Sequence, residues 1–351
     1  MKKYRIFVFA NLKPSQIEYK IIPLSESFLV EHVYVLRKKP LNLSNPKITC
    51  LYLPWILRQR PLYWFFTAIF GMFKIKKFKT NLILSYNIFP HGFNAYVASK
   101  ILKQPTIFSD ICEDTKNYYQ KKIPYLLINK IFKNATVICT PGSNTANFWD
   151  QNGYLKTSLL HSSINIEKFK PDFNKTKKYD YIFIGTFDNN KRPDVIINIF
   201  SKIKNEFNDV KLCIIGFGEL EKSIVQQISN LHLENEIDLI KTNNVLELLQ
   251  SSKALVMASK SEGIPCAMME AMACELIVII PPVGDITDVV KHATNGYLHN
   301  NTEEDILKWM IESYKNYDDL EFMRKNARET IINHHSFESA TKKWDELLNR
   351  I

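Results

Sequence analysis

The chain alternates short apolar runs with stretches whose apolar residues recur every three or four positions. In the first half, runs of four to seven residues predict strands at Tyr4–Ala10, His32–Leu36, Ile48–Leu53, Leu82–Tyr86, Thr106–Ser109, Thr136–Cys139 and Ser158–His161. Helical periodicity separates the later runs, at Gly92–Leu102, Ile123–Phe132 and Asn144–Asn152. This alternation predicts a mostly parallel sheet with helices on both faces.

The same alternation restarts after a polar, lysine-rich segment, Asn165–Lys178, which contains Pro171. Strands are predicted at Tyr181–Gly185, Lys211–Gly216, Ile237–Ile240, Ala254–Met257 and Ile277–Ile280. Helices are predicted at Pro193–Ile203, Leu220–Ser229, Val245–Gln250 and Met268–Cys274, and residues 303–351 are helical in period. The pattern therefore predicts an α/β protein of two doubly wound, Rossmann-like domains facing a cleft, with a helical C-terminal segment.

A length of 351 residues also favours two domains over one. We expect an N-terminal domain at residues 1–163, a linker at 164–178 and a second domain at 179–335. The last helix, residues 336–351, is expected to pack back on the N-terminal domain. In doubly wound sheets ligands bind at the carboxyl ends of the strands, so candidate chemistry is sought there.

Cysteine usage and hydropathy indicate a reducing compartment. None of the cysteines forms a C-x-x-C pair and most lie in apolar runs, which predicts reduced thiols and neither disulfides nor a zinc site: Cys50, Cys112, Cys139, Cys213, Cys266 and Cys274. The N-terminal apolar run, Ile6–Ala10, is too short for a signal peptide, and no run reaches the length of a membrane span. We expect a cytoplasmic protein.

Positive charge is concentrated in the first half of the chain. Residues 1–150 hold 22 Lys and Arg against 7 Asp and Glu, whereas the rest holds 24 against 29, and residues 51–100 contain no acid at all. Such a field requires an anionic partner: nucleic acid, a phosphorylated substrate or a membrane surface. No nucleic-acid-binding motif accompanies it.

A basic aromatic stretch, residues 53–79, lies within this half. Its apolar part, Pro61–Phe73, is too short to span a bilayer, but basic residues flank it and Trp55 and Trp64 lie at its margins. The basic residues are Arg58, Arg60, Lys74, Lys76, Lys77 and Lys79. This composition predicts contact with an anionic membrane surface; the alternative is a core helix with a lysine-rich solvent end.

Two glutamates, Glu262 and Glu270, carry the sharpest chemical signal. They lie eight positions apart after a predicted strand, and Gly263 and Pro265 between them predict a turn that precedes a helix. The start of that helix suits a phosphate or sugar oxygen, and its residues are Ile264, Pro265, Cys266 and Ala267. The Glu270 carboxylate is suited to the two vicinal hydroxyls of a ribose. On spacing alone, a pair of exposed helix glutamates is an equal alternative.

The E-x7-E arrangement with its Gly-x-Pro interior resembles the motif of family 4 glycosyltransferases, which have the GT-B fold. Further landmarks fall in the family's order. Residues 159–171 resemble its interdomain segment, and Phe183–Phe187 with Lys191 resembles the first strand and loop of its donor domain. Leu212–Gly218 resembles the next strand and turn, and Pro282–Ile286 with Asn295–Leu298 resembles the segment after the helix. The resemblance is strong over roughly residues 159–300 and weaker over 82–152.

The resemblance implies roles for these residues. Glu270 would bind the donor ribose, Glu262 would orient a hydroxyl of the transferred sugar, and Lys191 would neutralise the diphosphate leaving group. Gly185, Gly216 and Gly218 would border the nucleotide. The implied reaction is retaining transfer of a hexose from a nucleotide diphosphate sugar, of unspecified base, to a lipid-linked or surface glycan, without a metal ion or other cofactor.

The sequence departs from the family in both halves. Thr186 stands where the family commonly has Arg, and Arg192 is a candidate to compensate. Asp285 follows Gly284 where a second glycine is usual. In the first domain Asp110 replaces a frequent His, so it is either an acceptor-side base or part of a solvated acidic loop. His91 is either an acceptor contact or a packed histidine.

We therefore expect a glycosyltransferase that is peripheral on the inner face of a membrane, whose first domain binds a glycan or polyprenyl-linked acceptor. Two alternatives stay open. One is a nucleotide-sugar epimerase or hydrolase of similar fold. The other is a non-catalytic, membrane-associated partner subunit, which the missing Arg at Thr186 would suit.

Overall fold

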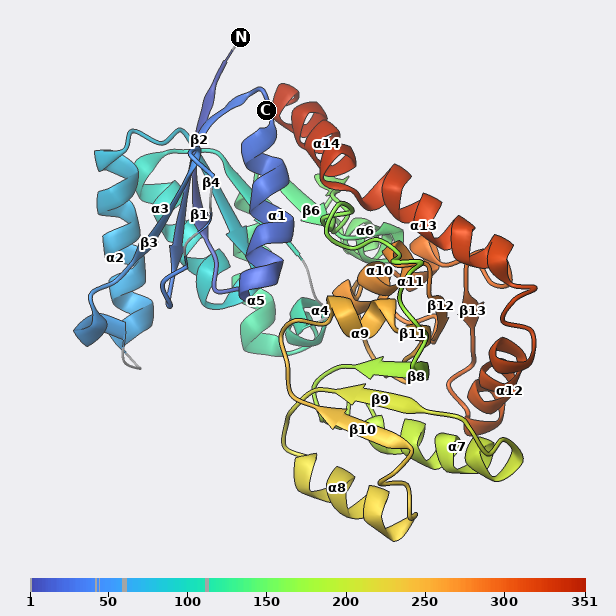
Figure 1. Ribbon diagram of the computed structural model, residues 1–351. Helices are drawn as coiled ribbons and strands as arrows, with labels where there is room; N and C mark the ends of the chain where they lie inside the picture. Colours follow the sequence, from blue (N-terminus) through green and yellow to red (C-terminus); the bar gives the residue numbers. More distant parts are fainter. Residues whose placement is uncertain (1, 42, 44, 59–61, 111–113) are drawn as a thin grey trace. The chain divides into compact units, whose positions relative to one another are not determined.

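The computed structural model describes residues 2–41, 43, 45–58, 62–110 and 114–351. The chain divides into two compact units, each of which holds one parallel sheet (Figure 1). Unit 1 comprises Met1–Ser163 and Phe337–Ile351, and unit 2 comprises Ile164–Ser336. Residues 59–61, Cys112 and Glu113 lie outside the described residues.

Unit 1 is built on seven strands in the order β3-β2-β1-β4-β5-β6-β7, with every neighbouring pair parallel. The strands are β1 (Tyr4–Phe9), β2 (Val30–Arg37), β3 (Ile48–Tyr52), β4 (Leu82–Tyr86), β5 (Thr106–Ser109), β6 (Val137–Thr140) and β7 (Thr157–Leu159). The strand order reverses between β1 and β4, so the loops that leave their carboxyl ends diverge there. In this architecture such a point is where ligands bind.

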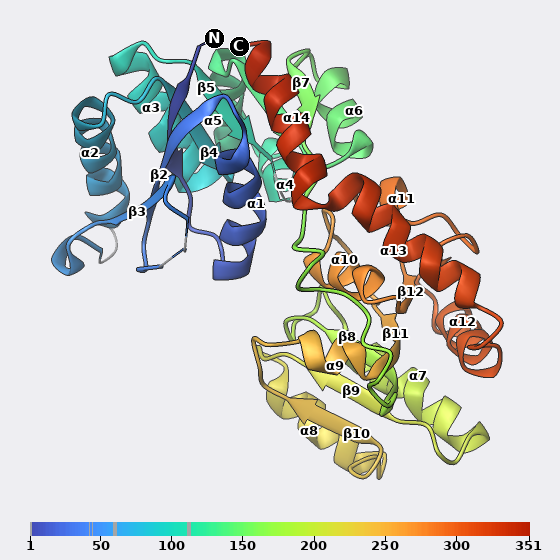
Figure 2. The same cartoon turned by 45° about the horizontal axis from the view of Figure 1, so that its top comes forward.

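Helices cover both faces of the unit 1 sheet. On one face α1 (Pro14–Glu26) and α14 (Phe337–Asn349) lie side by side in both views (Figures 1 and 2), and Trp344 of α14 is buried in the core that α1 shares with β1 and β2. On the other face α2 (Leu62–Lys77) and α3 (Phe93–Leu102) pack on Phe7 and Phe9. The remaining helices are η1 (Trp55–Arg58), η2 (Ile88–Gly92), α4 (Asp114–Tyr119), α5 (Lys122–Asn134) and α6 (Ser143–Gln151).

Unit 2 is built on six parallel strands in the order β10-β9-β8-β11-β12-β13. The strands are β8 (Tyr179–Ile184), β9 (Leu212–Ile215), β10 (Ile237–Ile240), β11 (Ser252–Val256), β12 (Ile277–Ile280) and β13 (Tyr297–Leu298). The helices are α7 (Pro193–Glu206), α8 (Glu221–Asn230), α9 (Leu246–Gln250), α10 (Cys266–Ala273), α11 (Ile286–Val289), α12 (Glu303–Lys315) and α13 (Glu321–His335). Here the order reverses between β8 and β11.

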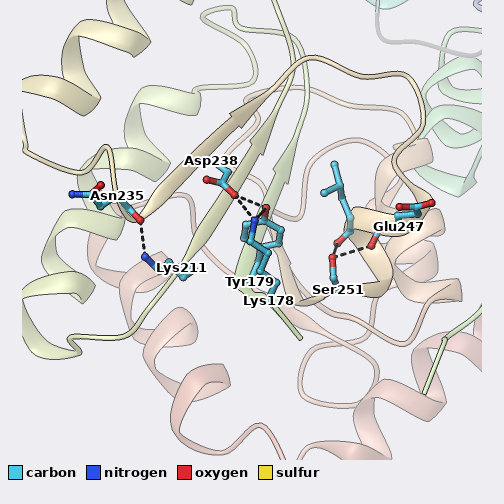
Figure 3. A network of polar contacts seen from close by, with 8 residues as sticks. Lys178, Tyr179, Lys211, Asn235, Asp238, Glu247 and Ser251 are labelled. Atoms are coloured by element: carbon cyan, nitrogen blue, oxygen red, sulfur yellow. Dashed lines mark hydrogen bonds and ion pairs between the residues drawn. The ribbon is translucent and has the colours of Figure 1, made fainter. Parts of the chain in front are cut away.

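Polar contacts tie together the amino-terminal edge of the unit 2 sheet (Figure 3). Lys178 Nζ and the Tyr179 hydroxyl both donate to Asp238 Oδ2, at 2.8 and 2.5 Å, and Lys211 Nζ donates to the Asn235 carbonyl at 2.6 Å. The bonds from Lys178 and Tyr179 hold the pKa of Asp238 below its ordinary value. These residues lie where β8, β9 and β10 begin, so the residues with candidate chemistry occupy the opposite edge.

The sequence prediction of two doubly wound α/β sheets with a helical C-terminal segment is confirmed. The predicted bounds of β4, β5, β10 and β12 agree with the structure to the residue. Residues 164–178, expected as a linker, group with unit 2, where Phe169 is buried. Among the described helices none has the length and hydropathy of a bilayer span.

Candidate functional site

The loop after β8 is shaped by the Asp188 carboxylate. Asp188 Oδ1 accepts hydrogen bonds from the backbone N–H groups of Asn190 (3.0 Å) and Lys191 (2.8 Å), and the Thr186 hydroxyl donates to Oδ2. Burial raises the pKa of Asp188, but these hydrogen bonds outweigh burial and lower it below its ordinary value. Thr186 therefore bonds within the loop, and the turn presents the side chain of Lys191.

Lys191 meets Glu262 across the point where the unit 2 strand order reverses. Lys191 Nζ donates to Glu262 Oε1, and the two side chains are only 21% and 10% exposed. The same two loops are joined by Asn190, whose Nδ2 donates to the Ser261 carbonyl (3.0 Å) and whose carbonyl accepts from the Lys260 N–H (2.9 Å). The structure thus brings together two of the predicted site residues, which are 71 positions apart in sequence.

Three glycines allow these loops to approach one another. A Cβ on Gly216 would lie 2.0 Å from the Gly185 carbonyl oxygen, and one on Gly218 would lie 2.4 Å from the Phe187 carbonyl oxygen. Gly284 has φ +61°, and its Cβ would lie 1.8 Å from the Glu262 carbonyl oxygen. At these positions a side chain has no room without displacement of backbone.

Glu270 lies on α10, the helix that follows the Glu262 loop. The helix begins at Cys266, two residues before the predicted start at Met268, so Glu270 is its fifth residue. Glu270 is 8% exposed, and with Glu262 also largely buried the alternative of two exposed glutamates is wrong. At the start of the helix Ile264 and Pro265 are buried, whereas Cys266 and Ala267 are half-buried.

Arg192 contacts the segment that follows β13, which the sequence analysis did not identify as part of the site. Its Nη1 donates to Asn301 Oδ1 at 3.1 Å, and Asn301 Nδ2 donates to the Ser259 carbonyl at 3.1 Å. His299 lies beside them: its Nε2 donates to the Met257 carbonyl (2.9 Å), and its Nδ1 accepts from the Asn301 N–H (3.1 Å). Burial lowers the pKa of His299 to about 4, so this imidazole is neutral at pH 7.

Asp285 follows Gly284 at a position where the family usually has a second glycine. The structure buries it completely, and its backbone N–H donates to the Gly263 carbonyl at 3.3 Å. Asp285 therefore lies directly beneath the loop that carries Glu262.

In unit 1 the two candidate acceptor-side residues follow β4 and β5. Asp110 is 1% exposed, and its Oδ2 accepts from Trp149 Nε1 at 2.8 Å, so the alternative of a solvated acidic loop is wrong for this residue. His91 is 3% exposed, and no described residue pairs with its Nδ1. Burial lowers the pKa of His91 to about 4, so it too is neutral at pH 7. A role in acceptor binding stays a prediction for both.

The basic aromatic stretch forms η1 and α2. Helix α2 buries Tyr63, Thr67 and Ile75, and Ile75 packs with Phe7 and Phe9 of the sheet, whereas other positions are exposed; α2 is thus a surface helix and not a core helix. Its outward row, with η1, carries large apolar side chains that are 46% to 72% exposed: Trp55, Ile56, Trp64, Phe65, Ile69 and Phe73. Lys76 and Lys77 are exposed where α2 ends. We call these eight residues the aromatic–lysine face.

Unit 2 contains the part of the chain that matches a known family. Residues 165–330 match the model of glycosyl transferases group 1. Over 140 residues the chain is 35% identical to the N-acetyl-alpha-D-glucosaminyl L-malate synthase of Bacillus anthracis, an alignment that covers 37% of this chain and 36% of that relative. The chain thus spans little more than a third of the length of this curated relative.

Two further likenesses extend over the whole chain. The chain is 23% identical over 342 residues to the GalNAc-alpha-(1->4)-GalNAc-alpha-(1->3)-diNAcBac-PP-undecaprenol alpha-1,4-N-acetyl-D-galactosaminyltransferase of Campylobacter jejuni, covering 93% of this chain and 91% of that protein. The crystal structure of Alr3699/HepE from Anabaena with UDP-glucose matches 99% of this chain and 100% of its own, with a TM-score of 0.81 and 15% identity. The predicted GT-B type of fold is confirmed.

Proposed function

We propose that this chain is a glycosyltransferase that transfers a hexose from a nucleotide diphosphate sugar to a lipid-linked or surface glycan, with retention of anomeric configuration. The carrying observation is the Lys191–Glu262 pair, which lies at the strand-order reversal of unit 2 with Glu270 on the next helix. In a doubly wound sheet this is the place where a nucleotide binds.

Each residue suits one part of such a donor. Lys191 supplies the positive charge that a departing diphosphate needs, Glu262 accepts from a sugar hydroxyl, and Glu270 accepts from the ribose hydroxyls. The match of residues 165–330 to glycosyl transferases group 1 supports this assignment. The Anabaena structure contains UDP-glucose, which supports a nucleotide-sugar donor here.

Unit 1 is proposed to bind the acceptor. The Campylobacter relative is named for an undecaprenol-diphosphate-linked acceptor, and this supports an acceptor of that chemical class. An enzyme that acts on such a lipid works beside a membrane, and we place this one on the inner face. The aromatic–lysine face of α2 fits this placement, because exposed aromatic and basic side chains bind the interface of an anionic bilayer.

Donor binding tests the core of the proposal. Thermal unfolding is measured with UDP, GDP, CMP and their sugars, and transfer to a lipid-linked glycan acceptor is followed by mass spectrometry. One nucleotide is expected to stabilise the wild type, and Glu262→Gln and Glu270→Gln are expected to abolish transfer. If both variants transfer normally, the site assignment is wrong. The configuration of the product, read by NMR, tests retention.

The same assay separates the alternatives. Conversion of the donor without any acceptor would support an epimerase or hydrolase. Thr186 stands where the family usually has an arginine, and its hydroxyl is bonded to Asp188 within the same loop. The missing guanidinium favours a non-catalytic subunit as the second candidate. That candidate predicts no stabilisation by any nucleotide. Because Lys191 supplies positive charge, we expect transfer to continue in EDTA.

Liposome flotation tests the membrane placement. The wild type is expected to float with phosphatidylglycerol vesicles and not with phosphatidylcholine vesicles. Replacing Phe65 and Phe73 with Ser should abolish flotation, whereas Phe173→Ser, an 84% exposed site in unit 2, should not. Equal flotation of all variants would remove the aromatic–lysine face from the proposal.

A further inference from the structure

Arg37 is a buried cation that the structure leaves only partly bonded. It is the last residue of β2, is 4% exposed, and donates from Nη2 to the Leu12 carbonyl at 2.9 Å. Its Nε and Nη1 atoms, which carry three N–H groups, have no hydrogen-bond partner in the part of the chain that the structure describes. Among the described residues no carboxylate forms an ion pair with it, whereas Arg5 of the same sheet pairs with Glu31.

Such a group is costly to keep. Unsatisfied N–H groups removed from water destabilise a fold, and the cost is larger when the group is charged. Burial accordingly lowers the pKa of Arg37. An arginine held in this state is explained when a partner that is absent from the free chain completes its hydrogen bonds.

The surroundings of Arg37 select an anion as that partner. Leu12 directly precedes the residue that caps the start of α1, where the helix dipole is positive. Lys38 follows Arg37 and places Nζ 5.5 Å from the ring centre of Tyr63 on α2. The titratable groups whose charge acts on Arg37 are Cys50 and Tyr63, and burial raises the pKa of both, so neither carries a negative charge at neutral pH.

The location matches the acceptor side of unit 1. Arg37 and Leu12 lie where β2 and β1 end, at the carboxyl edge of the sheet. We propose that Arg37 binds a phosphate or diphosphate group of the acceptor, with Lys38 adding charge. This deepens the proposed function and rests on it for the identity of the acceptor. A guanidinium binds phosphate oxygens through paired N–H donors, which a lysine at this position would not reproduce.

Inorganic pyrophosphate is the probe, and the full chain is used. Lys191→Ala serves as background, because it is expected to weaken pyrophosphate binding at the proposed unit 2 site. Thermal unfolding is compared for this background and for its combinations with Arg37→Met, Arg37→Lys and the exposed control Arg5→Met. We expect millimolar pyrophosphate to raise the Tm by about 2 to 4 °C with Arg37 or the Arg5→Met control, and not with Arg37→Met.

The stability of Arg37→Met without any ligand is a second test. Arg37→Met removes unsatisfied donors, so in anion-free buffer it is expected to be as stable as its background or more stable, which separates loss of binding from misfolding. An unchanged pyrophosphate shift in Arg37→Met would overturn the proposal.

Vesicles distinguish the acceptor from a membrane headgroup. Flotation of Arg37→Met with phosphatidylglycerol vesicles is expected to equal that of the wild type, and loss of flotation would overturn the assignment to the acceptor. UDP stabilisation in an otherwise unchanged chain with Arg37→Met is expected to persist. If UDP stabilised neither the wild type nor the variant, the proposed donor site would be wrong, and the pyrophosphate result would still stand.

Discussion

Lys191 Nζ donates to the Glu262 carboxylate between two loops of unit 2. The cation proposed for the donor diphosphate is therefore neutralised before any donor arrives. In the proposed donor site, a diphosphate that binds Lys191 would compete with Glu262 and release it toward the sugar. The pair would thus couple arrival of the donor to placement of the Glu262 carboxylate.

This coupling predicts opposite effects of its two members. Lys191→Ala should weaken UDP binding about 10- to 100-fold, since a hydrogen bond to a charged group contributes roughly 1.5 to 3 kcal/mol. Glu262→Gln should leave UDP binding unchanged or tighter, because Lys191 no longer has a carboxylate partner, yet reduce transfer about 100-fold or more. Isothermal titration and initial rates measure the two effects. Weaker UDP binding in Glu262→Gln would contradict the competition.

Glu270 is expected to act on binding of the nucleotide. Glu270→Ala should remove the thermal stabilisation by UDP or whichever nucleotide binds, because the ribose hydroxyls lose their acceptor. Glu275→Gln, just past the end of the same helix, is the matched control and should keep the full shift. Stabilisation of Glu270→Ala equal to that of the wild type would exclude a ribose contact.

Gly216 is predicted to tolerate no side chain. A Cβ would lie 2.0 Å from the Gly185 carbonyl oxygen, so Gly216→Ala should lower the free energy of unfolding by about 1 to 3 kcal/mol. Gly185→Ala is the control, because its nearest contact is a Phe183 ring carbon at 3.1 Å, which can shift. Urea unfolding of both variants gives the comparison, and equal stabilities would show that the loops separate readily.

Stability should fall in mild acid because of the buried histidines His91 and His299. The pKa values of His91 and His299 are lowered to about 4 by burial, whereas an unfolded histidine has a pKa of about 6.5. Between these values the unfolded chain binds more protons, so stability is complete above about pH 6.5 and is lost as pH falls toward 4. His299→Gln, which keeps a donor for the Met257 carbonyl, should reduce the slope of Tm against pH between 7 and 5. The exposed His334→Gln should not.

Most of the fold was predictable because buried parallel strands are continuous apolar runs. The strands Leu82–Tyr86 and Ile277–Ile280 are buried at every position. Asn81 and Asn87 bound the first, and Pro281 ends the second, so these limits are explicit in the sequence. Helix α1 was not predicted: Pro23 lies inside it, and a proline usually ends a helix. Its place is set by packing of Ile17, Ile21 and Leu24 on the sheet.

The sequence predicted which elements carry the candidate site residues but not the contacts between those residues. The spacing of Glu262 and Glu270 placed them on a loop and a helix, and the structure agrees. No local pattern shows that Lys191 bonds Glu262, or that Asp110 accepts from Trp149. His299 and Asn301 were missed, although they directly follow the Asn295–Leu298 landmark. Such contacts depend on which strands become neighbours in the sheet, and a linear sequence does not state that.

Substitution of Trp344 tests how much α14 contributes to the stability of unit 1. Its side chain is 2% exposed in the core shared with α1, so Trp344→Ala should cost about 3 to 5 kcal/mol of unfolding free energy. Lys342→Ala, on the same helix and paired with Glu338 four residues before it, should cost less than about 1 kcal/mol. Equal effects would mean that α14 does not contribute to the core.

Helix α14 belongs to unit 1 but follows all of unit 2 in the sequence. Unit 1 therefore cannot complete its folding before unit 2 has been synthesised. Residues 164–336 leave the ribosome before residues 337–351, so unit 2 has all of its strands while the first sheet still exposes the surface that Trp344 covers. The first half of the chain is thus synthesised first, but its core is completed only when α14 has been added. A chain that ends at Ser336 is therefore expected to have a folded second unit and a protease-sensitive first one.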